Sequence, residues 1–364
     1  MIKKSLLSTD LVRPIWDKQE YRSLERIWLD KNECSDPDMQ NIVFDALSKV
    51  TVDEIYSYPN LNNLYKKLSN FVGVSSNNLL ITNGSDGAIR SCFEATIEPG
   101  DKIVLTRPSF AMYDVYSKIY GADVSWLDYS ATPDGPYLDI KQIISVIKET
   151  MPKLVCLPNP DSPTGTVFSP DDLRMIIVAA GKVGALMLID EAYHPFYSWS
   201  AAPWIFEYSH LLVVRSFSKA WGAAGLRVGY AIANKDLISY INKQKPMYEI
   251  GNVSAKATEY LLNHVDDMML SVSKINAGKK YFQDAMLALG LTTYECHGNF
   301  LHVQFGEYET EIHKKLEPLV YYRKSFSEES LMGYSRFSAT TKEQFAPIVG
   351  CIKQIVKGDD WSNL

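Results

Sequence analysis

One lysine of the chain stands among small and hydroxyl-bearing residues, in the stretch SFSKAWGAAGLRVGY that spans residues 216–230. A lysine amine held beside a carbonyl compound forms a Schiff base, which is a starting point for covalent catalysis. Hydroxyl and guanidinium groups bind phosphate, and Ser216, Ser218 and Arg227 place such groups around Lys219. The stretch therefore predicts amine chemistry beside a phosphate site, and a lysine exposed in a surface loop is the alternative.

A carboxylate at the end of an apolar run is the second candidate. In LIDEAY, residues 188–193, Asp190 follows two aliphatic residues, and Tyr193 lies three residues further on. A carboxylate buried at a strand end is costly unless a cation pairs with it. Asp190 therefore predicts a cationic partner, and a strand end that reaches solvent is the alternative.

The segment NGSDG, residues 83–87, follows the apolar run LLIT and begins a helical pattern. Gly84 permits a tight turn, and the free N–H groups of a helix start can hold a phosphate. Ser85 and Asp86 are also residue types that cap helices, so a plain helix cap is the alternative. This short motif alone does not distinguish the two.

Together these three motifs predict a pyridoxal 5′-phosphate (PLP) site. The aldehyde of PLP needs a lysine, its pyridine nitrogen needs an acidic partner, and its phosphate needs amides, hydroxyls and an arginine. Other phosphate motifs are absent from the sequence, because neither GxxxxGK[ST] nor GxGxxG occurs in it.

Short β-branched runs alternate with amphipathic stretches through the middle of the chain, which predicts a mostly parallel, doubly wound sheet. Ligands of such sheets bind at the carboxyl ends of the strands, where all three motifs lie. From about Asn252 onward a long helical pattern over 253–289 indicates a second, smaller domain. The expected strands are LLIT, KIVLT, DVSWL, KLVCLPNP, ALMLIDEAY, LLVVRSF and VGYAIA.

Composition argues against several other classes of protein. The net charge is −6 and no block of Lys and Arg occurs, so nucleic acid is not an expected partner. The longest apolar run, at 175–189, is interrupted by Lys182 and two glycines, so no membrane span is expected. The five cysteines are scattered without a CxxC pair, and neither metal-ligand spacing nor a disulfide framework is indicated. The cytoplasm is the expected location.

With these motifs, the sequence resembles the fold-type I, PLP-dependent aminotransferases, and within them the histidinol-phosphate aminotransferase group. The resemblance covers nearly the whole chain and rests on segments in the family's order: LDKNECSDP, YSYPN, NGSDG, RPSFAMY, NPDSPTG, DEAY, SFSKAWGAAGLRVGY, GNFLHVQF and YSRFSATTKEQ. It implies a large PLP-binding domain at 45–255, with a seven-stranded, mostly parallel sheet. It implies a small α/β domain formed by 1–44 and 256–364.

The resemblance also implies roles around the cofactor. Lys219 bonds to the aldehyde and later moves the proton, Asp190 pairs with the pyridine nitrogen, and Tyr193 contacts the cofactor's phenolic oxygen. Further cofactor contacts are implied for Gly84, Ser85, Asp86, Phe110, Ser162, Ser216, Ser218 and Arg227. Tyr58 would reach the phosphate from the neighbouring subunit, so a homodimer is expected.

For the substrate, the resemblance implies that Arg336 binds a carboxylate as a fork and that Asn32 lies near it. Arg323 stands where the family often has another arginine and could bind a substrate phosphate; a solvent-exposed arginine is the alternative. The expected reaction moves an amino group from glutamate to a small, phosphorylated oxo acceptor. Two alternatives are a PLP-dependent decarboxylase of a phospho-amino acid, and a PLP-binding sensor without catalysis.

Three positions depart from the family's pattern. Ser162 stands where an asparagine is usual before Pro-Thr-Gly, and Gly87 stands where a glutamate usually follows the aspartate of NGSDG. Phe110 lacks the hydroxyl of the tyrosine that is often found there.

Overall fold

The computed structural model describes residues 4–7, 11 and 21–358; those parts of the predicted small domain that fall at 1–3, 8–10, 12–20 and 359–364 lie outside the described residues. Within the described ranges, no helix has the length and apolar character needed to cross a membrane. Nor do three or more His, Cys, Asp or Glu side chains in these ranges gather as a metal-ion site would require.

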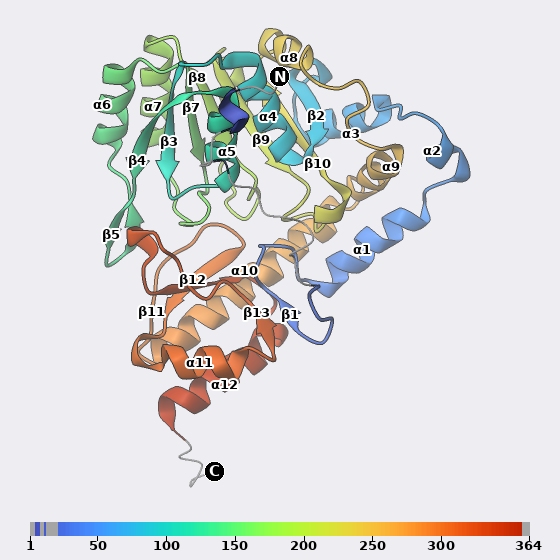
Figure 1. Ribbon diagram of the computed structural model, residues 1–364. Coiled ribbons are helices and arrows are strands. Elements are labelled where there is room, and N and C mark those ends of the chain that lie inside the picture. Colours follow the sequence, from blue (N-terminus) through green and yellow to red (C-terminus); the bar gives the residue numbers. More distant parts are fainter. Residues whose placement is uncertain (1–3, 8–10, 12–20, 359–364) are drawn as a thin grey trace.

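A seven-stranded sheet forms the centre of the larger part of the molecule, with the strand order β2-β10-β9-β8-β7-β3-β4 (Figure 1). Only β10 runs antiparallel to its neighbours within this sheet. The predicted mostly parallel, doubly wound α/β sheet is therefore confirmed. Its strands are β2 (Leu79–Asn83), β3 (Lys102–Arg107), β4 (Asp123–Asp128), β7 (Leu154–Pro158), β8 (Leu186–Asp190), β9 (Leu211–Ser216) and β10 (Val228–Ala233).

Alternate side chains of these strands enter two separate cores, because successive residues of a strand point to opposite faces. In β8, for example, Met187 and Ile189 pack on one face, while Leu186 and Leu188 pack on the other. One core is covered by α4 (Gly84–Thr96), α5 (Ala111–Tyr120) and α8 (Lys235–Asn242). The other is covered by α1 (Pro37–Ser48), α3 (Asn62–Val72), α6 (Ile140–Thr150), α7 (Pro170–Lys182) and α9 (Asn252–Leu261).

A second, smaller part lies below the large sheet in Figure 1 and carries its own hydrophobic core. Strands β11, β12 and β14 form an antiparallel sheet, and β1 pairs with β13 in parallel, so the N-terminal segment joins this part. Its elements are β1 (Ile27–Trp28), β11 (Thr292–Thr293), β12 (Phe300–Gln304), β13 (Val320–Tyr321), β14 (Tyr334–Ser338), α11 (Glu309–Leu316) and α12 (Lys342–Lys357). The short helix α2 (Val52–Tyr56) and the hairpin of β5 (Ser130–Thr132) and β6 (Gly135–Tyr137) contribute no residue to these three cores.

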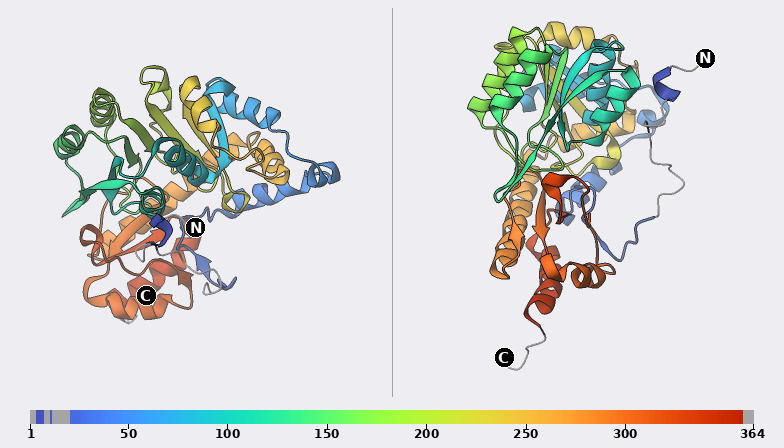
Figure 2. Two further views of the ribbon diagram at one scale, coloured as in Figure 1. Left: turned by 45° about the horizontal axis from the view of Figure 1, so that its top comes forward. Right: turned by 60° about the vertical axis from the view of Figure 1, so that its left-hand side comes forward.

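The long helix α10 (Val265–Ala288) joins the two parts, and Figure 2 shows it running from one to the other. Its first half contributes Met268, Val272 and Ile275 to a core of the large sheet. Its second half contributes Phe282 and Met286 to the core of the small part. The predicted domain limits at 45–255 and 256–364 stay a prediction, since one helix belongs to both cores.

Candidate active site

The carboxyl ends of β7, β8 and β9 and the start of α4 surround one cavity of about 260 Å³. Most residues singled out from the sequence line it: Ser85, Asp86, Phe110, Ser162, Asp190, Tyr193, Ser216, Ser218, Lys219 and Arg227. Residues without an earlier assignment complete the lining: Lys31, Glu33, Pro158, Pro160, Ala192 and Ala224. The fold thus brings the three motifs together, as the rule for parallel sheets predicts.

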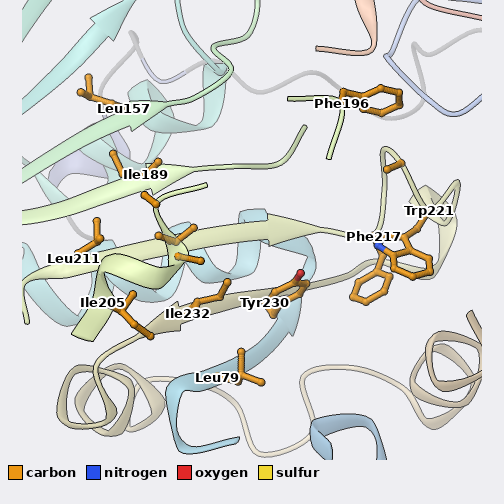
Figure 3. Packing of buried hydrophobic residues seen from close by; sticks show 14 of the residues in the cluster. Leu79, Leu157, Ile189, Phe196, Ile205, Leu211, Phe217, Trp221, Tyr230 and Ile232 are labelled. Atoms are coloured by element: carbon orange, nitrogen blue, oxygen red, sulfur yellow. The ribbon is translucent and has the colours of Figure 1, made fainter. Parts of the chain in front are cut away.

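Lys219 follows β9 in a loop that is anchored by aromatic packing. Phe217 and Trp221, on either side of it, are buried with ring centroids 5.3 Å apart, and both lie at the edge of the core in Figure 3. The Nζ of Lys219 donates to the carbonyl oxygen of Lys31 over 3.0 Å. Burial, followed by the nearby charge of Arg336, lowers the pKa of Lys219 to about 8. An amine with this pKa is partly neutral near pH 7, which a nucleophile or base requires.

Asp190 ends β8 and is buried at the floor of the cavity. Its carboxylate accepts hydrogen bonds from the backbone N–H of Ala192 at 2.9 Å and from the hydroxyl of Tyr113 at 3.2 Å. Burial raises the pKa of Asp190 to about 6, against the effect of these two donors. No ion pair to Asp190 occurs in the part of the chain that the structure describes. A cationic group in the cavity would therefore supply the partner that the buried carboxylate lacks.

Tyr113 was not identified from the sequence, although it belongs to the segment RPSFAMY. It lies three residues after Phe110 on α5, and the two rings meet edge to face with centroids 6.1 Å apart. Its helical spacing from Phe110 is the signal that could have indicated a second ring on the same side. Phe110 itself is 39% exposed at the cavity.

Tyr193 is held by a residue from the N-terminal segment. The side-chain amide of Asn32 donates to the hydroxyl of Tyr193 over 3.0 Å, and both residues are buried. The backbone N–H of Asn32 donates to Ser338 Oγ over 2.8 Å, and its φ of 54° lies in the left-handed region, which Asn tolerates better than most residues. Burial raises the pKa of the Tyr193 phenol, whereas the charge of Arg336 and hydrogen bonds from Ser162 and Asn32 oppose this rise.

Groups suited to binding a phosphate border the cavity at the start of α4. We call residues 84–86, at the start of α4, the phosphate-binding turn, after the role that we propose for them below. A Cβ on Gly84 would lie 2.7 Å from Nη2 of Arg227, so this position, with φ 71°, requires glycine. The Arg227 Nη1 donates to Ser218 Oγ over 3.4 Å. Unpaired helix N–H groups, hydroxyls and a guanidinium converge here, which fits an anion such as phosphate.

Arg336 is buried in β14 and is incompletely paired. Its Nη2 donates to the carbonyl oxygen of Asp30 over 2.9 Å, and its Nε has no hydrogen-bond partner within the described residues. Burial lowers the pKa of Arg336, and its charge in turn acts on Lys219 and Tyr193, so it lies close to the cavity. An incoming carboxylate would satisfy the unpaired N–H.

Arg323 and Tyr58 do not line the cavity. The backbones of Arg323 and Arg336 pair as an antiparallel bridge, but the guanidinium of Arg323 lies 3.8 Å from the ring centroid of Phe326. Tyr58 is 78% exposed, and its ring stacks on Tyr248 with centroids 4.5 Å apart.

Comparison with known proteins agrees with this geometry. Residues 25–350 match the model of the family "Aminotransferase class I and II". The chain is 32% identical over 332 residues to the histidinol-phosphate aminotransferase of Clostridium novyi (strain NT), covering 90% of this chain and 91% of that protein. It is 30% identical to that of Caldanaerobacter subterraneus subsp. tengcongensis, with coverages of 87% and 88%.

Solved structures show the same fold. The histidinol-phosphate aminotransferase of Sinorhizobium meliloti, in complex with pyridoxal-5′-phosphate, has a TM-score of 0.78 at 19% identity and covers 91% of each chain. The enzyme of Clostridium acetobutylicum has a TM-score of 0.77 at 20% identity, covering 91% of this chain and 99% of that one. The chain therefore belongs to the class I and II aminotransferases, a family of enzymes that depend on pyridoxal 5′-phosphate.

Proposed function

We propose that the protein transfers an amino group, with glutamate as the donor, to a small phosphorylated oxo substrate, in the manner of histidinol-phosphate aminotransferase. The observation that carries the proposal is the single cavity that joins Lys219, the buried Asp190 and the phosphate-binding turn, with Arg336 beside it. The curated relatives named above are aminotransferases, which favours transamination over decarboxylation of a phospho-amino acid.

The cavity residues suit PLP at both of its ends. When bound, PLP supplies an aldehyde that bonds to amines and a ring that accepts electrons from the substrate carbon. Asp190 would keep the ring nitrogen protonated, and this positive charge would in turn be the cationic partner of the buried carboxylate. The phosphate-binding turn, Ser216, Ser218 and Arg227 would hold the phosphate, and Phe110 would cover the ring face.

Tyr193, Asn32 and Ser162 form the hydrogen-bonding group for the cofactor's phenolic oxygen in this proposal. Asn32 orients the Tyr193 hydroxyl, and Ser162 takes the place of the usual asparagine. The free amine of Lys219 has a depressed pKa and lines the same cavity as Asp190 and Tyr193, so it would remove and return a proton at the carbon of a substrate bound there.

Arg336 is the proposed anchor of the donor's carboxylate, because a buried guanidinium with an unpaired Nε gains a bidentate partner there. Arg323 is the proposed partner of the acceptor's phosphate. In the structure its guanidinium stacks on Phe326 and approaches Glu328 at 3.8 Å, so this role requires a side-chain rotation.

A homodimer, with Tyr58 contributed to the partner's site, is part of the proposal. Large apolar side chains are exposed on α1 and α2, which precede Tyr58 in the chain, and next to Tyr248, on which Tyr58 stacks: Phe44, Val52, Ile55, Tyr56 and Met247. Exposed apolar patches of this kind mark interaction surfaces, and a second copy of the chain would cover this one. A cytoplasmic location also belongs to the proposal.

A direct assay tests the proposed function. Purified protein with PLP should be yellow, with an imine band that borohydride removes. Glutamate should be converted to its oxo acid in the presence of a phosphorylated ketone or aldehyde, without release of carbon dioxide. Turnover of an unphosphorylated aromatic oxo acid alone would contradict the phosphate preference, and carbon dioxide release from a phospho-amino acid would favour the decarboxylase.

A further inference from the structure

The start of α4 contacts a carboxylate from a distant segment. Glu249, in the loop between α8 and α9, accepts a hydrogen bond at Oε1 from the backbone N–H of Asn83 over 3.1 Å. Asn83 is both the last residue of β2 and the N-cap of α4. The contact therefore fixes the residue that directly precedes the phosphate-binding turn.

The lack of a side chain at Gly87 makes room for this carboxylate. A Cβ built on Gly87 would lie 2.7 Å from Oε1 of Glu249, a separation that real Cβ atoms do not show. Gly87 lies within α4 and does not have a positive φ, so its backbone does not require glycine. Oε1 of Glu249 is the nearest obstacle to a side chain at this position, and Cβ of Thr82, 3.3 Å from the same point, is the next.

Glu249 is largely buried beside a cation, and its Oε2 has no hydrogen-bond partner among the described residues. Its side chain is 11% exposed, and its Oε2 lies 3.8 Å from the ammonium of Lys245, which is 7% exposed. Burial lowers the pKa of Lys245, and the charge of Glu249 opposes that decrease. A carboxylate beside the first turn of a helix also interacts favourably with the helix dipole.

We propose that Glu249 is a positioning residue of the cofactor site. It holds Asn83, and thereby keeps the N–H groups of the phosphate-binding turn directed at the cofactor phosphate. This inference rests on the proposed function, since it takes that turn as the site of the phosphate. Glu249 does not line the cavity around Lys219. It lines a neighbouring cavity together with Asn83 and Arg227, so its effect on the phosphate site passes through these residues.

The test is a double-mutant cycle on cofactor affinity. Apoenzyme of the wild type, Glu249→Ala, Gly87→Ala and the double variant is titrated with PLP, and formation of the imine band is followed. Loss of one charge-assisted hydrogen bond should weaken PLP binding about tenfold in Glu249→Ala. Gly87→Ala should weaken it comparably, because the new methyl group displaces the carboxylate. In the Glu249→Ala background the same change should have a much smaller effect, because only the contact with Cβ of Thr82, 3.3 Å from the new methyl group, remains.

Two further variants separate positioning from general stability. Glu249→Gln retains an oxygen that accepts from Asn83, so its PLP affinity should stay within about threefold of the wild type. Gly350→Ala, in α12, adds a methyl group where nothing lies within 4 Å, and serves as the matched glycine control. Gly350→Ala should leave PLP affinity unchanged, both in the wild type and in the Glu249→Ala variant. Thermal midpoints of all apoenzymes are recorded alongside, and inorganic phosphate is used as a competing probe of the turn.

Additive effects of Gly87→Ala and Glu249→Ala on PLP affinity would overturn the inference. So would a lowered thermal midpoint in Glu249→Ala with unchanged affinities for PLP and phosphate, which indicates a structural role only. If Glu249→Ala does not fold, the PLP affinities of Gly87→Ala and Gly350→Ala still test the inference. Equal affinities in these two variants would overturn it. Wild-type protein that forms no reducible imine would overturn the proposed function itself, a result distinct from an additive cycle in a protein that binds PLP.

Discussion

The side-chain amide of Asn32 donates a hydrogen bond to the hydroxyl of Tyr193 over 3.0 Å, across the boundary between the two parts of the molecule. Asn32 follows the short strand β1 of the small part, and Tyr193 follows β8 of the large sheet. This hydrogen bond connects the N-terminal segment to a residue that lines the cavity with Lys219, so we expect the position of that segment to affect the proposed chemistry.

Asn32→Gly should lower kcat about fivefold, because the variant loses the hydrogen bond to Tyr193 and the one that Ser338 Oγ donates to Asn32 Oδ1, while glycine still adopts the φ of 54°. Asn32→Ala should lose more, since alanine is strained at this φ. Steady-state kinetics and thermal midpoints of the two variants separate the hydrogen bond from the backbone. Equal kcat in Asn32→Gly and wild type would show that the contact has no catalytic role.

The rate at which apoenzyme forms an imine with PLP should depend on the ionisation state of Lys219. Its pKa of about 8 lies below the ordinary value of 10.5, so the neutral amine accumulates as the pH rises through 8. The rate of imine formation by apoenzyme and PLP should therefore rise with pH to a plateau, with a midpoint near 8. Stopped-flow absorbance measures this rate.

Arg336→Gln removes a positive charge that lowers the pKa of Lys219, so the midpoint should move upward in that variant. Lys219→Ala should give no reducible imine, and its activity should fall by a factor of about 10³ or more. A reducible imine in Lys219→Ala would remove this residue from its proposed role.

Two arginine variants should distinguish the residue that binds the glutamate carboxylate from the residue that binds the acceptor phosphate. Arg336→Lys should raise the KM for glutamate about 10- to 100-fold, because an ammonium cannot form the bidentate pair. Arg323→Lys should leave that KM nearly unchanged and raise the KM of the phosphorylated acceptor. The same effect of both variants on glutamate alone would contradict a phosphate role for Arg323.

Mixing two inactive variants tests the proposed contribution of Tyr58 across a dimer. If Tyr58 serves the partner's site, a mixed dimer of Tyr58→Ala and Lys219→Ala subunits contains one intact site. Random exchange of subunits should then restore about a quarter of the wild-type activity. If Tyr58 serves its own subunit, the mixture stays as inactive as its components. Each variant alone, carried through the same exchange, is the control.

The sequence predicted those parts of the site that depend on local pattern. Strand–helix alternation places Asp190 and Lys219 at neighbouring strand ends, and the topology of a parallel sheet brings these ends together. The motifs at residues 83–87 and 216–218, which contain the proposed phosphate donors, meet at the same cavity for the same reason. Such motifs can be recognised because the chemistry and the fold are both encoded within a few residues.

The contacts that escaped prediction join residues far apart in the chain. The spacing of Tyr113 from Phe110 indicates a second ring on that side of α5, but it does not reveal the contact with Asp190. The contact of Glu249 with Asn83 likewise has no local signal. The meaning of Gly87 illustrates the difference: from the sequence it is only a missing side chain, whereas in the structure it is space taken by Glu249.

The helix α10 limits how the protein can be divided. A fragment that ends before it would lack Met268, Val272 and Ile275, and would expose the apolar surface that they cover in the large core. A fragment that begins with it would carry these three residues into solvent. Neither piece would therefore be a sound choice for separate expression.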